Sequence, residues 1–134
     1  MPTSTIKYQE NLRTKAIHLK SNNTLVTDAP IDNNGKGETF SPTDLVATAL
    51  GSCMLTIIGI KANDHGFNID DIKMNVTKVM SSTPRRISEI LIEFDFLEKS
   101  FSEKEKTIIK NAAKSCPVAL SLESTIKQEL IFNF

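Results

Sequence analysis

The feature that most constrains how this sequence can fold is a run of sixteen residues without a charge, positions 45–60. Ser41 suits a helix cap, Pro42 fits the first helical position, and Asp44 follows in the first turn. Apolar residues then recur about every four positions and also fill the faces between. We therefore expect a helix that is apolar nearly all round and ends near Gly66. Because the run is shorter than the about 20 residues that a bilayer needs, it indicates an enclosed helix and no membrane span.

The rest of the chain predicts strands on both sides of this helix. Residues 4–28 are typical of short strands, with turn residues at 11 and 21–23 and a polar loop at 32–38. Two strands with alternating apolar residues are expected at 72–79 and 87–97. Ser102 and Glu105 form a capping box that begins a second helix, and a short helical piece and a strand at 125–134 follow. This order predicts one α+β domain, residues 1–134, with helices packed against antiparallel sheets.

Charge and cysteine content narrow the function. Sixteen basic and sixteen acidic residues cancel without forming a long run, so net charge favours neither nucleic acid nor a membrane surface as partner. The first residues lack a basic segment followed by an apolar one, so we expect no signal peptide and a cytoplasmic protein. Two cysteines in such a chain favour free or redox-active thiols over structural disulfides.

The cysteines belong to no local motif. Cys53 lies in the predicted helix, and Cys116 precedes Pro117 at a helix break 63 residues further on. A lone cysteine in an apolar helix is most often a small hydrophobe, and that interpretation stays open at this point. Cys116 is the more unusual, because a cysteine near a helix N-terminus is favoured as thiolate. His18 and His65 add no zinc-binding spacing, so no metal site is expected, and no serine-nucleophile or phosphate-loop motif occurs.

Two segments resemble one known family. Residues 41–54, SPTDLVATALGSCM, are similar to the central helix of OsmC/Ohr proteins, a family of thiol peroxidases, and residues 113–122, AKSCPVALSL, resemble its second cysteine segment. The stretches at 12–14 (LRT) and 35–38 (GKGE) are also typical of one branch. The order of elements agrees from end to end, so the resemblance covers nearly the whole chain.

The resemblance implies an OsmC-like α+β fold and an intertwined homodimer, in which two antiparallel sheets enclose the apolar central helices. It also implies a peroxidatic thiol at Cys53 and a resolving thiol at Cys116. A thiolate at Cys53 would reduce a hydroperoxide and become a sulfenic acid, which Cys116 would convert into a disulfide. No cofactor is implied, but an external dithiol or a lipoylated protein must reduce that disulfide.

A buried thiol needs a nearby cation to ionise. By resemblance Arg13 is that cation, and we expect Glu38 to orient it. The organic hydroperoxide branch has a glutamate ten residues before the first cysteine, but Thr43 stands there in this sequence. The neighbouring Asp44 is the alternative orienting acid, although it also suits the helix N-terminus.

The sequence thus predicts a hydroperoxide reductase that prefers organic or fatty-acid hydroperoxides. The alternative is a protein that binds a small ligand or handles sulfur on the same dimeric scaffold, and a structural dimer with inert cysteines is a third interpretation. Peroxidase chemistry requires the two cysteines to lie within disulfide reach, with Cα atoms about 4.4–6.8 Å apart.

Overall fold

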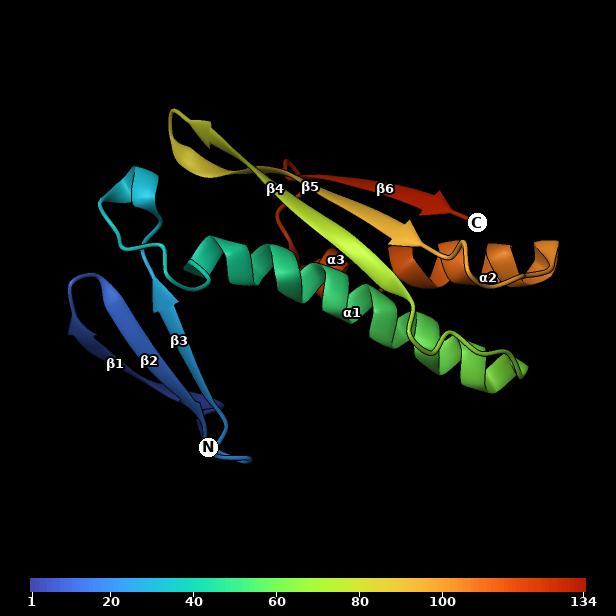
Figure 1. Ribbon diagram of the computed structural model, residues 1–134, viewed down its shortest axis with the longest axis horizontal. Coiled ribbons are helices and arrows are strands. Elements are labelled where there is room, and N and C mark those ends of the chain that lie inside the picture. The colour runs from blue at the N-terminus through green and yellow to red at the C-terminus, as the bar shows by residue number, and fades with distance from the viewer. The chain divides into compact units, whose positions relative to one another are not determined.

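The computed structural model describes all 134 residues and divides into two compact units, Met1–Val46 and Ala47–Phe134. Three strands, a long helix, two strands, two helices and a last strand follow one another in the order that the sequence predicts, and the mixture is α+β (Figure 1). The elements are β1 (Ser4–Glu10), β2 (Arg13–His18), β3 (Thr24–Asp28), η1 (Ile31–Asn33), α1 (Pro42–His65), β4 (Lys73–Ser82), β5 (Arg85–Asp95), α2 (Glu103–Lys114), α3 (Pro117–Ser121) and β6 (Lys127–Asn133).

The first unit contains an antiparallel sheet in the order β1-β2-β3. Its first turn has Asn11 and Leu12 at φ values of 55° and 63°, the left-handed conformation that two-residue hairpin turns favour. Every residue of β1 is exposed. The buried residues of this unit are polar, namely Thr27, Asp28 and Ser41, so polar contacts rather than an apolar core hold it together.

The loop after β3 folds back onto the end of that strand. The Gly35 N–H donates to the Pro30 carbonyl at 2.9 Å, and the Gly37 N–H donates to the Ala29 carbonyl at 3.2 Å. A Cβ atom at Gly35 would lie 1.7 Å from the Ala29 oxygen, so this close approach requires glycine. These bonds fix the chain directly before Glu38.

The second unit contains a sheet in the order β4-β5-β6. Strands β4 and β5 are antiparallel, but β6 is parallel to β5 (Figure 1). The prediction of two antiparallel sheets is therefore wrong for this sheet, which is mixed. The reason is the connection: α2 and α3 return the chain to the starting end of β5, so that β6 runs in the same direction as β5.

The core of the second unit lies where α1 and α2 pack against this sheet. Helix α1 lies close to the strands at Gly51, where an added Cβ would meet Met74, Val76 and Ile92. Most of the fully buried side chains come from both helices and from β5 and its end: Leu50, Met54, Ile58, Ile90, Ile92, Phe94, Phe96, Ile109 and Ala113. This burial, rather than helix propensity, stabilises α1.

Helix α1 follows the predicted bounds and ends before Gly66, whose φ of 75° suits a helix stop. The 24 residues of α1 extend past the uncharged run. By length and composition alone the helix could cross a bilayer, but the core helices of soluble proteins can have the same length and composition. Within one chain α1 is buried mainly along one face, since Val46 and Ile60 are exposed. The expected burial on most sides is thus not complete in a single chain.

Both predicted helix starts are built as reciprocal caps. The Ser102 hydroxyl accepts the Glu105 N–H at 3.1 Å, and the Glu105 carboxylate accepts the Ser102 N–H at 2.8 Å. At α1 the Ser41 hydroxyl accepts the Asp44 N–H at 3.1 Å, and the Asp44 carboxylate accepts the Ser41 N–H at 3.0 Å. Asp44 therefore serves the N-terminus of α1, as its position in the sequence indicates.

Candidate active site

The structure assembles the four predicted site residues as two pairs, one in each unit. Cys53 and Cys116 lie together in the second unit, and Arg13 and Glu38 lie together in the first.

The two cysteines are free thiols whose side chains contact each other. Cys53 is half-buried on α1, while Cys116 is fully buried at the N-cap of α3. Burial and the neighbouring Cys53 side chain both raise the pKa of Cys116, so the two thiols lie close enough to interact. The fold therefore brings together two thiols that are 63 residues apart in the sequence.

The surroundings of Cys116 favour its protonated form. Burial is the largest cause that raises its pKa, and the interaction with Cys53 raises it further. The Ala119 N–H, which donates to the Cys116 sulfur at 3.3 Å, acts in the opposite direction. Cys116 is thus held as a neutral thiol beside the more accessible Cys53, which can carry the first reaction.

In the first unit Arg13 is held by two carboxylates. Its Nε donates to Asp28 Oδ1 at 2.7 Å, and its Nη2 donates to Asp28 Oδ2 at 2.8 Å and to Glu38 Oε1 at 3.2 Å. The bond to Arg13 is the largest cause that lowers the pKa of Asp28, and the same pair raises the pKa of Arg13. The predicted contact between Glu38 and Arg13 is present, but the stronger partner is Asp28.

Asp28 is a residue that the sequence analysis missed. It is the last residue of β3 and lies directly opposite Arg13, the first residue of β2, in the antiparallel register. Its side chain is 1% exposed, against 62% for Glu38. The sequence could have indicated this residue, because a carboxylate at the end of an otherwise uncharged strand needs a basic partner once the strand is buried.

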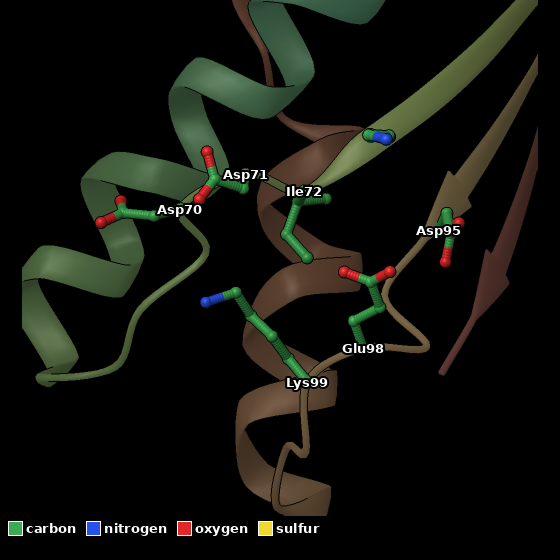
Figure 2. Close-up of a pocket in the computed structure, with 7 residues that line it drawn as sticks. Asp70, Asp71, Ile72, Asp95, Glu98 and Lys99 are labelled. Atoms are coloured by element: carbon green, nitrogen blue, oxygen red, sulfur yellow. The ribbon is translucent and has the colours of Figure 1, made fainter.

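A separate hollow of about 220 Å³ lies where the ends of β4 and β5 meet the segments beside them. It is lined by four acidic and two basic residues and by Ile72: Asp70, Asp71, Lys73, Asp95, Glu98 and Lys99. Figure 2 shows Asp70 and Asp71 on one side of Ile72, and Asp95 and Glu98 on the other. No group of three His, Cys, Asp or Glu side chains in the chain is arranged to hold a metal ion.

The α+β fold and the contact between Cys53 and Cys116 place this chain among the α+β proteins in which two cysteines far apart in the sequence lie together. The family of OsmC-like proteins matches residues 35–130, so the chain belongs to the OsmC/Ohr family. No curated protein sequence matches.

Solved structures agree with this assignment. A protein of Psychrobacter arcticus 273-4, named for osmotic stress induction and a detoxification response, is 53% identical, with 99% of this chain and 96% of that chain covered and a TM-score of 0.91. Two others share the fold at low identity. The organic hydroperoxide resistance protein OsmC of Legionella pneumophila is 16% identical, with 100% of this chain and 98% of that chain covered and a TM-score of 0.74. The organic hydroperoxide resistance protein OhrB of Bacillus subtilis is 14% identical, with 98% of each chain covered and a TM-score of 0.62.

Proposed function

We propose that this protein is a thiol-dependent peroxidase that reduces organic hydroperoxides, including those of fatty acids. The observation that carries the proposal is the direct contact of the free thiols Cys53 and Cys116, of which one is fully buried and protonated and the other is more accessible. The names of the related Legionella and Bacillus proteins, which refer to organic hydroperoxide resistance, support the class of substrate.

The reaction follows from thiol chemistry. The Cys53 thiolate attacks the distal oxygen of the hydroperoxide, the O–O bond breaks, and the alkoxide leaves and takes up a proton as the alcohol. Cys53 is then a sulfenic acid. The Cys116 sulfur attacks it, the S–O bond breaks, and water leaves as the disulfide forms. An external dithiol or a lipoylated protein returns both thiols, so the cycle needs no bound cofactor.

The cation of this proposal is Arg13, because its guanidinium stays charged at every physiological pH. Asp28 and Glu38 accept bonds from Nε and Nη2, which leaves the Nη1 edge unoccupied by either carboxylate. An arginine held along one edge can present the other to a thiolate or to a peroxide oxygen.

We further propose that the chain acts as one domain in a cytoplasmic homodimer. Large apolar side chains stay exposed on the sheet of the first unit and on α1, among them Ile6, Tyr8, Ile17, Leu25 and Ile60. A soluble protein seldom leaves so many such side chains uncovered, and a second copy of the chain would cover them. The cytoplasm supplies the reducing thiols that the cycle requires.

The test is to count thiols and measure the intact mass before and after one equivalent of cumene hydroperoxide. We expect two thiols and about two mass units to be lost per chain, since an intramolecular disulfide removes two hydrogens. Two unchanged thiols would refute peroxidase activity and favour ligand binding on the same scaffold. Size-exclusion chromatography with light scattering tests the dimer separately.

A further inference from the structure

The two cysteines differ in how far a molecule from outside can reach their sulfur atoms. Cys116 is 0% exposed and belongs to the apolar core of the second unit, whereas Cys53 on α1 is half-buried and packs against that core. Thiol–disulfide exchange requires a thiolate to approach one of the two sulfurs. Once the two thiols have joined, a reductant therefore reaches the disulfide from the Cys53 side, and attack on Cys116 would require the core to open.

Helix α3 begins at Cys116 and holds its sulfur in place. The Ala119 N–H donates to the Cys116 sulfur at 3.3 Å, and the Leu120 N–H donates to the Cys116 carbonyl at 3.1 Å. Pro117 occupies the start of α3, where its fixed φ suits a helix. The side chains of Val118 and Ala119 pack against the core. The position of Cys116 is thus set by α3 as well as by the core.

Two side chains from the sheet fasten this segment. Gln128 on β6 donates from its Nε2 to the Ala119 carbonyl at 3.0 Å, in a partly buried contact. Arg86 on β5 donates from its Nη2 to Glu123 at 2.9 Å and to Thr125 at 2.7 Å, in the segment between α3 and β6. The bonds of Arg86 are exposed, so they contribute little. Gln128 is therefore the contact that fixes the residue whose N–H bonds the Cys116 sulfur.

The acidity of the leaving thiol opposes the effect of access. A thiol of low pKa leaves faster, but burial raises the pKa of Cys116. The Cys53 side chain raises it further, yet in a mixed disulfide Cys53 carries neither a proton nor a charge, so that cause disappears. The N–H groups of Ala119 and Val118 lower the pKa and stabilise the leaving charge. Because thiol pKa changes the rate of exchange only a few-fold per unit, access decides.

We propose that the reductant attacks the disulfide at Cys53 while Cys116 is the leaving thiol, and that Gln128 is a positioning residue that keeps Cys116 in this role through Ala119. The inference rests on the proposed function, in which the disulfide forms during turnover. A thiolate of the dithiol bonds to the Cys53 sulfur, the Cys53–Cys116 bond breaks, and its electron pair goes to Cys116, which takes up a proton. The second thiolate of the dithiol then attacks the dithiol's own sulfur in the mixed disulfide, which releases the Cys53 thiolate and the cyclic oxidised reductant.

The test determines which cysteine receives the first sulfur of the reductant. The disulfide is formed with diamide and treated briefly with excess glutathione, a single thiol; acid then stops the exchange, and N-ethylmaleimide blocks free thiols. Trypsin places Cys53 in peptide 37–61 and Cys116 in peptide 115–127, and the chain has no other cysteine. We expect glutathione on peptide 37–61 and the maleimide on peptide 115–127. Equal shares, the reverse distribution or no adduct at all overturns the proposal.

Treatment in urea is the control for the fold. In the unfolded chain both sulfurs are accessible, so the two peptides should carry similar shares of glutathione. Because diamide forms the disulfide, the distribution does not depend on hydroperoxide reduction. A chain that fails to reduce hydroperoxides but shows the expected distribution refutes only the peroxidase.

Gln128→Ala tests the positioning role. It removes the bond to the Ala119 carbonyl, and Gln9→Ala on the exposed strand β1 is the matched control that makes the same chemical change away from α3. We expect Gln128→Ala to raise the share of glutathione on Cys116 severalfold, because α3 no longer covers that sulfur as closely, and Gln9→Ala to leave it unchanged. A merely structural Gln128 would lower the free energy of unfolding without changing the distribution, and that result overturns the positioning role.

Discussion

Two glycines in α1 allow a matched test of how this helix packs. An added Cβ at Gly51 would lie 2.7 Å from the Met74 sulfur and 2.9 Å from Val76 Cγ2. At Gly59 the nearest atom is Ile69 Cδ1, at the ordinary contact distance of 3.7 Å. The same substitution, glycine to alanine, therefore meets an occupied space at one position and free space at the other.

The magnitudes follow from two opposing effects. Alanine in a helix interior is favoured over glycine by about 0.8–1.0 kcal/mol, and this gain applies at both positions. Overpacking costs about 1–3 kcal/mol, and it applies only at Gly51, where the Met74 side chain can shift but the branched Val76 cannot easily do so. We expect Gly59→Ala to raise the free energy of unfolding by about 0.5–1 kcal/mol and Gly51→Ala to lie about 1–3 kcal/mol below it.

The assay is urea unfolding followed by circular dichroism, at one fixed protein concentration because a dimer's stability depends on it. The slope of each curve should stay equal to that of the parent, so that the midpoints report stability. A midpoint for Gly51→Ala that equals or exceeds that of Gly59→Ala would refute the close packing of α1 on β4. Gly51 is two residues from Cys53, so thiol counting on the same variants shows whether the packing also affects the site.

Three further outcomes are expected. Cys53→Ser abolishes hydroperoxide reduction, and full activity in this variant would contradict the mechanism. Cys116→Ser keeps the first oxidation but accumulates sulfinic and sulfonic acid on Cys53, and a measurement of the intact mass detects both products. Ser102→Ala removes the cap of α2 and lowers the free energy of unfolding by about 0.5–2 kcal/mol in urea, and an unchanged midpoint would contradict the capping box. Because folding lowers the pKa of Asp28, its ion pair with Arg13 stabilises the fold fully above about pH 4 and less as the pH falls through the lowered pKa. The free energies of unfolding of the parent and of Asp28→Asn should therefore converge as the pH falls. A difference between the two that stays constant from about pH 7 to about pH 2 would contradict this expectation.

The sequence by itself determined the features that depend on neighbouring residues. The start of α1 at Pro42, its end before Gly66 and the capping box at Ser102 were all predicted, because caps and apolar spacing act over a few positions. The two cysteine segments also sufficed to indicate the family, which the match over residues 35–130 confirms.

Only the tertiary structure decided which distant residues meet. Cys53 and Cys116 are brought together by the packing of α1 and α3 in one core, and Asp28 reaches Arg13 because of the register of β2 and β3. The parallel course of β6 likewise depends on where two helices return the chain. Local patterns specify neither register nor the direction of a returning strand, because both are set by burial of the whole set of apolar faces at once.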